Sequence, residues 1–362
     1  MNAASLLPEL PVGARILILR LRSIGDIILL TPTLRLLKDW RPDLRISVMV
    51  ESRFRELLQG NPAVEEILYP GEGSGVRTYY TRLAALREVR RRDFSLCVNL
   101  HGGPTSRLFT RGSAATWRVG FAHYRGASIY NILVPDARTI LNKPSLHTAE
   151  HQAAAFFHLG LPQREIPCAQ IFFGAEHAFW WEAKRASLGI AAVQPYAIIH
   201  PTASYKTKEW APDGFARIGE YLERQARIVP IYSCGPGEAP VLDAVEKAAG
   251  APLRRLQGMS LAQFAAALAR ARLFVGNDSG PAHMAAALGR PVVVIFGSSS
   301  SPIWGPWPNQ ASNLGARVVQ NPFDCNPCPG DRCYKFARPE CILSVTFDQV
   351  KDAVDDVLAK SA

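Results

Sequence analysis

The sequence predicts an α/β protein with two Rossmann-like, doubly wound domains, and three observations carry this prediction. Short apolar runs of strand length alternate with segments of helix length, as in a parallel sheet that is covered by helices. The alternation stops near residue 166 and starts again near residue 195. The chain has 362 residues, which is too many for one ordinary core and suits two. We therefore expect domains at 1–175 and 185–345 and a closing helix at 346–362.

The first half contains five expected strands separated by helix-like segments. The segment 78–92 is amphipathic, because Leu83, Leu86 and Val89 fall on one side of a helix. The expected strands are 15–20, 45–50, 66–69, 95–100 and 117–120, and the expected helices are 26–40, 53–59 and 78–92.

The second half repeats the alternation after a linking helix, which we expect between residues 166 and 192. In doubly wound sheets, ligands bind outside the carboxyl ends of the strands, so the turns at these ends are the places to search for a site. The expected strands are 195–200, 228–233, 273–276 and 292–296, and the expected helices are 213–225, 260–270, 281–288 and 346–360.

Composition excludes several protein classes. Hydrophobic residues make up 48% and charged residues 20%, which excludes a largely disordered chain. The apolar runs are far shorter than the ~20 residues of a membrane helix. No basic residue precedes an apolar stretch in residues 1–13, so a secretory signal is not expected there. We expect a soluble, cytoplasmic protein.

The net charge of +10 is concentrated in the first half. Residues 1–180 carry 22 Lys and Arg against 15 Asp and Glu, while residues 181–362 carry 19 against 16. Most of the excess is arginine, whose guanidinium group suits phosphate. The charge is consistent with an anionic partner, such as a phosphorylated lipid, a membrane surface or a nucleic acid, or with solubility alone.

The most informative turn is Gly276–Pro281, where an expected strand leads into an expected helix. Pro281 suits a first helical turn, and Gly280 lets a ligand approach the backbone. The free amides at such a helix start form an anion site suited to a diphosphate. An ordinary strand-to-helix connection, capped by Asp278 or Ser279, is the alternative.

Several motifs together resemble the bacterial heptosyltransferases of glycosyltransferase family 9, across nearly the whole chain. The resemblance implies a GT-B fold of two domains facing a central cleft. It also implies an N-terminal domain for a lipopolysaccharide acceptor, a C-terminal domain for ADP-heptose, and inversion at the sugar's anomeric carbon. The motifs are Ser23-Ile24-Gly25-Asp26-Ile27 with Thr31-Pro32, Lys208-Glu209-Trp210, Gly276-Asn277-Asp278-Ser279-Gly280-Pro281-Ala282-His283 and Phe296-Gly297.

The resemblance assigns catalytic roles to two residues. Asp26 matches the family's base, which takes the proton from the acceptor hydroxyl. Lys208 matches the lysine that neutralises the leaving diphosphate, without a cofactor in catalysis. Lys206 lies two residues away, and Glu209 shifts the spacing from the family pattern. Asp26 at a helix start is also a possible capping residue.

The resemblance also suggests residues that bind the sugar donor and residues that bind the acceptor. Glu238 is expected to hold the ribose, Asp278 the sugar hydroxyls, and Ser279 and Gly280 the phosphates. Solvated, capping or purely structural roles remain open for these residues and for His283. The donor set is Thr202, Glu238, Asp278, Ser279, Gly280 and His283, and the acceptor set is Gly25, His101, Arg107, Arg118 and Arg125.

Four of the seven cysteines are clustered within 17 residues that also contain several prolines. Such soft ligands in a segment with little core are typical of a structural zinc or iron site, although the second pair is wider than in common zinc sites. Reduced structural thiols and a redox role are the alternatives, since disulfides are not expected in the cytoplasm. The cluster is Cys325, Cys328, Cys333 and Cys341.

Other classes of protein fit the sequence less well. Gly25 stands alone where a nicotinamide dehydrogenase has G-x-G-x-x-G, and no G-x-x-x-x-G-K-[ST] occurs. Basic and aromatic residues do not interleave as in a nucleic-acid-binding module, so no nucleic acid is expected. The expected partners are ADP-heptose, a lipopolysaccharide core or lipid-linked acceptor, and the anionic inner face of the inner membrane. Another donor, a protein acceptor, or nucleotide-sugar binding without catalysis remain alternatives.

Overall fold

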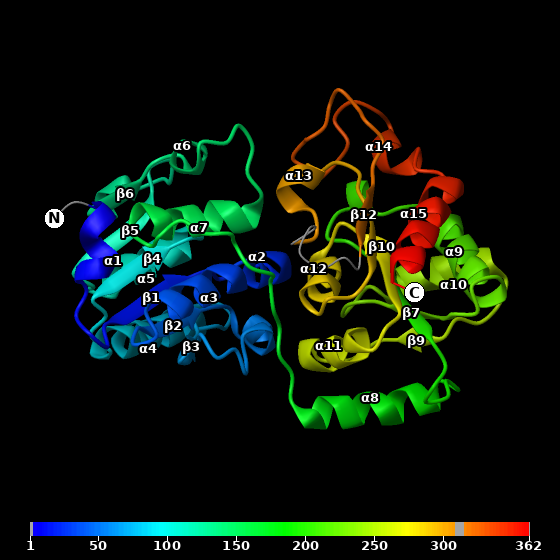
Figure 1. The fold of residues 1–362 in the computed structure, drawn as a ribbon, viewed down its shortest axis with the longest axis horizontal. Coiled ribbons are helices and arrows are strands. Elements are labelled where there is room, and N and C mark those ends of the chain that lie inside the picture. The colour runs from blue at the N-terminus through cyan, green and yellow to red at the C-terminus, as the bar shows by residue number, and fades with distance from the viewer. Residues whose placement is uncertain (1–2, 308–314, 362) are drawn as a thin grey trace. The chain divides into compact units, whose positions relative to one another are not determined.

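The computed structural model describes residues 3–307 and 315–361, and it divides the chain into two compact units (Figure 1). Unit 1 spans Met1–Phe172 and unit 2 spans Phe173–Ala362. Residues 1, 2, 308–314 and 362, which the expected domain ranges include, lie outside the described residues.

Unit 1 is built on a six-stranded parallel sheet in the order β3-β2-β1-β4-β5-β6. Residues 16–19 of the central strand are fully buried, as a parallel strand with both faces covered requires. Leu17 and Leu19 pack with Val89 and Phe109 in one cluster on one face of the sheet. The strands are β1 (Arg15–Leu19), β2 (Arg45–Met49), β3 (Glu66–Leu68), β4 (Leu96–Asn99), β5 (Trp117–Phe121) and β6 (Ile132–Val134).

The helices of unit 1 differ from the expectation at one important point. The segment expected as one helix, 26–40, forms two, because Pro32 has no amide proton to continue the first. Thr31 Oγ1 donates instead to the Ile28 carbonyl, at 2.7 Å. The α-helices are α1 (Leu6–Glu9), α2 (Ile24–Ile28), α3 (Thr31–Trp40), α4 (Val76–Arg91), α5 (Pro104–Gly112), α6 (Ala137–Leu141) and α7 (Thr148–His158). The 3-10 turns are η1 (Ala3–Ser5), η2 (Ser52–Leu57) and η3 (Ala127–Ile129).

Unit 2 has a second six-stranded parallel sheet with the same topology, in the order β12-β11-β10-β7-β8-β9. In each sheet the strand order reverses beside the first strand of the unit, between β1 and β4 and between β7 and β10. This reversal is the point where doubly wound sheets bind ligands. The strands are β7 (Tyr196–His200), β8 (Val229–Ser233), β9 (Arg255–Leu256), β10 (Leu273–Asn277), β11 (Val292–Ile295) and β12 (Ala316–Val319).

The helices of unit 2 include the expected closing helix. It is α15 (Phe347–Lys360), whose Val350, Val354 and Val357 lie in the same buried cluster as Val293 of β11. Within the described ranges, no helix combines the length and the apolar character needed to cross a membrane. The remaining helical segments are α8 (Ala175–Ser187), η4 (Lys206–Lys208), α9 (Pro212–Arg224), α10 (Ala239–Ala249), α11 (Leu261–Ala269), α12 (Gly280–Ala287), α13 (Ser301–Trp304) and α14 (Glu340–Leu343).

Candidate functional site

Asp26 lies in the first turn of α2, directly after the central strand of unit 1. Its Oδ2 accepts hydrogen bonds from the Ser23 amide and hydroxyl, at 3.0 and 3.1 Å, and so completes a capping box. Its Oδ1 accepts from the Arg20 guanidinium, which also donates to the Leu100 carbonyl. Three of the roughly four lone-pair positions of the carboxylate are therefore occupied, and about one remains for a ligand.

The backbone around Asp26 is also fixed. Gln152 of α7 donates from Nε2 to the Asp26 carbonyl, at 3.0 Å. Gly25 is buried inside α2 and contributes backbone only. The side chain of Asp26 is 16% exposed, so a ligand can reach it. The carboxylate is held in one orientation and remains accessible.

A cavity of about 420 Å³ opens at the carboxyl ends of the strands of unit 1. Arg22 and Arg82 face no carboxylate at ion-pair distance in the described part of the chain, and the Nε of Arg82 is buried without a hydrogen-bond partner. Arg53 pairs with Glu51, at 2.6 Å. The cavity therefore offers unpaired positive charge. It is lined by Leu21, Arg22, Glu51, Arg53, Pro70, Gly71, Glu72, Gly73, Thr78, Arg82, His101, Gly103, Pro104 and Thr105.

His101, an expected acceptor residue, lines this cavity because of the buried residue Asn99. The Asn99 side chain accepts from the His101 and Gly102 amides, each at 2.9 Å, and thereby shapes the turn after β4. Burial, followed by the positive charges of Arg20 and Arg22, lowers the pKa of His101. His101 is therefore neutral near pH 7.

The four other expected acceptor residues, Gly25, Arg107, Arg118 and Arg125, do not line the cavity. Arg107 donates to the Arg125 carbonyl, at 3.0 Å. Arg118 is the second residue of β5, at the amino end of the sheet, and donates to the carbonyls of Ile129 and Ala115. The unpaired positive charge at this cavity comes instead from Arg22 and Arg82.

Lys208 and Asp278 meet in unit 2, although 70 residues separate them. The Lys208 ammonium lies 2.7 Å from Asp278 Oδ2, and the two side chains are 22% and 6% exposed. The side chain of Lys206, in contrast, is 80% exposed, and its ammonium lies 2.6 Å from Glu209 Oε2. Of the two lysines, only Lys208 forms an ion pair with a residue of the turn after β10.

The last residue of β10, Asn277, holds this arrangement in place. It is fully buried, accepts from the Trp210 amide at 3.1 Å and donates to the Pro201 carbonyl at 2.8 Å. Trp210 is itself fixed, because its indole donates to the Val345 carbonyl at 2.8 Å. The segment that carries Lys208 is thus tied to β10 at both of its ends.

Thr202 and Glu238 are joined by a buried hydrogen-bonded chain. The Thr202 hydroxyl donates to Glu238 Oε2, at 2.6 Å, so it accepts from Nε2 of the buried His200, at 2.8 Å. The other ring nitrogen, Nδ1, then accepts from the Ser233 hydroxyl, at 2.9 Å. Burial lowers the pKa of His200 to about 4. Glu238 Oε2 also accepts from the Gly235 amide, at 2.7 Å.

The remaining expected donor residues surround the start of α12. Ser279 is its N-cap, and the Ser279 hydroxyl is buried with no hydrogen-bond partner among the described residues. Gly280 is the first helical residue, and His283 is buried within the helix. This helix start, beside Lys208, combines free amides, a hydroxyl and an ammonium group, which are the groups that bind a diphosphate.

The four clustered cysteines line one small cavity of about 40 Å³, together with Thr207 and Ser298. In the part of the chain that the structure describes, no three His, Cys, Asp or Glu side chains are arranged as a metal site requires. The expectation of zinc or iron at these cysteines therefore stays a prediction. The cysteine segment contacts the residue before Lys208, because the Thr207 hydroxyl donates to the Gly330 carbonyl.

Sequence reasoning assigned no role to four positioning residues: Arg20, Asn99, His200 and Asn277. Both asparagines end a strand next to the reversal point of their sheet, and this position is a signal that sequence could have provided. Arg20 and His200 are different, because their partners become evident only when the turns are folded.

Comparisons with known proteins show which family and which folds the chain is similar to. The family described as "Glycosyltransferase family 9 (heptosyltransferase)" matches residues 82–332. Lipopolysaccharide heptosyltransferase 3 of Escherichia coli K12 is 26% identical over 291 residues, covering 78% of this chain and 82% of that protein. The solved glycosyl transferase family 9 protein from Veillonella parvula gives a TM-score of 0.79 at 21% identity, covering 96% and 97%. E. coli ADP-heptose lps heptosyltransferase II gives 0.77 at 18% identity, covering 96% and 99%.

Proposed function

Because this chain belongs to glycosyltransferase family 9, the heptosyltransferase family, we propose that it transfers a heptose from ADP-heptose to a lipopolysaccharide core saccharide. The chain is a glycosyltransferase with a GT-B type fold of two Rossmann-like units. Lipopolysaccharide heptosyltransferases are among its relatives, and one similar structure is named for ADP-heptose. We propose a cytoplasmic site of action, where nucleotide sugars are available.

In this proposal Asp26 is the general base of a single inverting displacement. The acceptor hydroxyl loses its proton as the new glycosidic bond forms, and a carboxylate can take that proton. Arg20 and Ser23 fix the orientation of the carboxylate, while about one lone-pair position stays open. Arg20 therefore acts as a positioning residue, and Asp26 as the catalytic one.

The donor is proposed to bind to unit 2 at the start of α12. Lys208 and the amides at Ser279 and Gly280 neutralise the charge that develops on the departing ADP. Glu238 retains its Oε1 oxygen for the ribose hydroxyls, since Oε2 is occupied by Thr202 and Gly235. These groups supply the neutralising charge, so we propose that catalysis needs no metal ion.

The acceptor is proposed to bind to unit 1 at the 420 Å³ cavity, whose lining includes Leu21 and Arg22 of the turn before Asp26 but not Asp26 itself. Arg22 and Arg82 offer unpaired guanidinium groups for a phosphate or carboxylate of the core saccharide. His101 adds a neutral hydrogen-bonding group. A lipid-linked acceptor would bring the enzyme to an anionic membrane surface.

The observation that carries the proposal is the 2.7 Å ion pair between Lys208 and Asp278 at the start of α12. Nucleotide-sugar donors should be screened by mass spectrometry against core-truncated lipopolysaccharide. We expect a mass increase of one heptose with ADP-heptose and none with UDP- or GDP-sugars. ADP binding without turnover of any donor would indicate a binding protein, and turnover of another sugar would correct the donor.

A further inference from the structure

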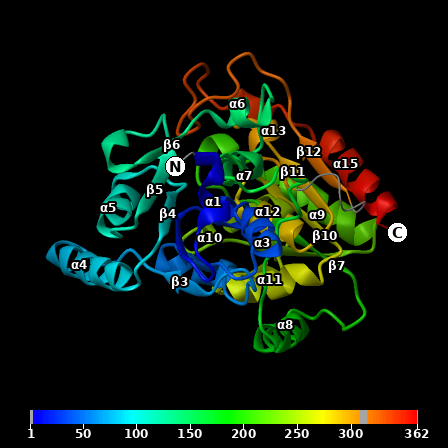
Figure 2. The same cartoon turned by 60° about the vertical axis from the view of Figure 1, so that its left-hand side comes forward.

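Helix α4 of unit 1 buries very few of its side chains and exposes several apolar ones. Only Val89 of its 16 residues is buried. Val76, Tyr79 and Tyr80, which lie within five residues, are 71%, 69% and 66% exposed. Figure 2 shows α4 at the periphery of unit 1. Elsewhere in the described residues, large exposed apolar side chains are more dispersed, and α4 therefore presents the main concentrated apolar surface of unit 1.

The same helix carries unpaired positive charge. Arg77, Arg87 and Arg90 are exposed, and their guanidinium groups have no ion-pair partner in the described part of unit 1. Tyr80 follows Val76 by four residues and Arg87 follows Tyr80 by seven, so these three residues lie on one face of the helix. Tyrosines occupy the first half of this face and arginines the second.

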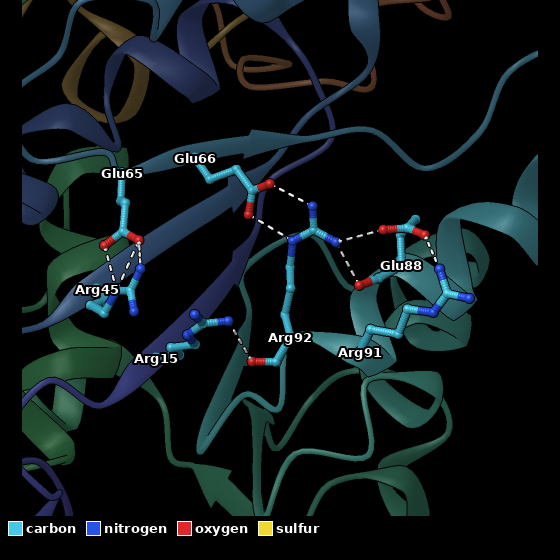
Figure 3. Close-up of polar contacts among 7 residues, drawn as sticks. All are labelled: Arg15, Arg45, Glu65, Glu66, Glu88, Arg91 and Arg92. Atoms are coloured by element: carbon cyan, nitrogen blue, oxygen red, sulfur yellow. Dashed lines mark hydrogen bonds and ion pairs between the residues drawn. The ribbon is translucent and has the colours of Figure 1, made fainter.

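The C-terminal end of α4 is fixed to unit 1. Figure 3 shows Arg92, which follows the helix, between Glu66 of β3 and Glu88 of the helix. Arg15 donates to the Arg92 carbonyl at 3.1 Å. On its inner side, α4 contributes Thr78 and Arg82 to the acceptor cavity. The helix is therefore a fixed element with one side toward the cavity and one side in solvent.

We propose that the outer face of α4 docks on an anionic phospholipid bilayer. Tyrosine rings are favoured at the headgroup level of a bilayer, and arginines bind lipid phosphates. A helix of 16 residues is too short to span the bilayer, so it would lie in the interface. The inference rests on the proposed function in one respect: docking would present a lipid-linked acceptor beside the cavity that Thr78 and Arg82 line.

Vesicle flotation of the full chain tests the proposal directly. We expect binding to vesicles of phosphatidylcholine with phosphatidylglycerol, weak binding to phosphatidylcholine alone, and release as salt rises, because salt screens these charges. The double variants Tyr79→Ser/Tyr80→Ser and Arg87→Gln/Arg90→Gln should each bind about tenfold more weakly. Phe179→Ser, which removes a 75% exposed side chain of α8, is the matched control and should bind like wild type.

Activity separates docking from catalysis. With a deacylated, soluble core saccharide, both α4 variants should keep the turnover of wild type, and with acceptor in anionic vesicles they should be slower. Equal vesicle binding by wild type and variants, or equal binding to both kinds of vesicle, would overturn the proposal. Loss of turnover on the soluble acceptor would also overturn it, since α4 would then serve catalysis or a protein partner. If no heptose is transferred at all, the proposed function fails while flotation still tests docking.

Discussion

Replacement of Lys208 by methionine tests both the ion pair and its proposed role toward the donor diphosphate. The variant leaves Asp278, whose side chain is 6% exposed, without its cation. Removal of one partner of a buried pair costs about 3–5 kcal/mol, and the 22% exposure of Lys208 lets water reduce this to about 2–3 kcal/mol. For a unit of this size, the Tm should fall by about 5–10 °C.

Lys206→Met is the matched control, since it removes a lysine two residues away. That side chain is 80% exposed and its pair with Glu209 lies at the surface, where a salt bridge contributes about 0–1 kcal/mol. Asp278→Asn combined with Lys208→Met should recover most of the lost stability, because no uncompensated buried charge remains. These measurements define the structural part of the effect.

The catalytic part is measured as kcat/KM at a temperature well below the Tm of each variant. Loss of one preorganised charge at the leaving diphosphate should reduce kcat/KM of Lys208→Met by about 10²–10³, whereas Lys206→Met should keep wild-type activity. Calorimetry should also show weaker ADP binding to Lys208→Met. Activity within a factor of ten of wild type, or an equal loss in Lys206→Met, would refute the reasoning.

Other predictions follow from neighbouring contacts. Asp26→Asn should lower kcat by about 10²–10⁴ with unchanged donor KM, and more than a tenth of wild-type turnover would exclude Asp26 as the base. Gly297→Ala should slow transfer, since a Cβ would lie 2.6 Å from the Thr207 carbonyl beside Lys208; an unchanged kcat argues against this coupling. His200 has a pKa of about 4 when folded and about 6.5 when unfolded, so its contribution to stability is present above pH 6.5 and is lost as the pH falls to 4. The free energy of unfolding, measured by urea titration, should therefore fall by up to about 1.4 kcal/mol per pH unit more in wild type than in His200→Gln, and parallel curves would contradict this. EDTA should leave turnover unchanged if Lys208 supplies the neutralising charge, and magnesium-restored activity would oppose it.

The sequence by itself determined the local elements. Apolar runs such as 15–20 and 292–296 became strands β1 and β11, because period and length are local properties of the chain. The turn residues around Gly25 and Gly280 were also evident, since glycine and proline act on their own backbone. Very short elements were missed, such as the three residues of β6, because so few residues carry no periodicity.

Only the tertiary structure decided which side chains meet. Lys206 and Lys208 are chemically alike and two residues apart, and folding directs one to Glu209 and the other to Asp278. The unpaired Arg22 follows the carboxyl end of β1 and Arg82 lies in helix α4, and only the packing of this helix in the folded unit brings both side chains to one cavity. Strand order and the packing of loops set such contacts, and these depend on burial across the whole unit rather than on neighbours in sequence.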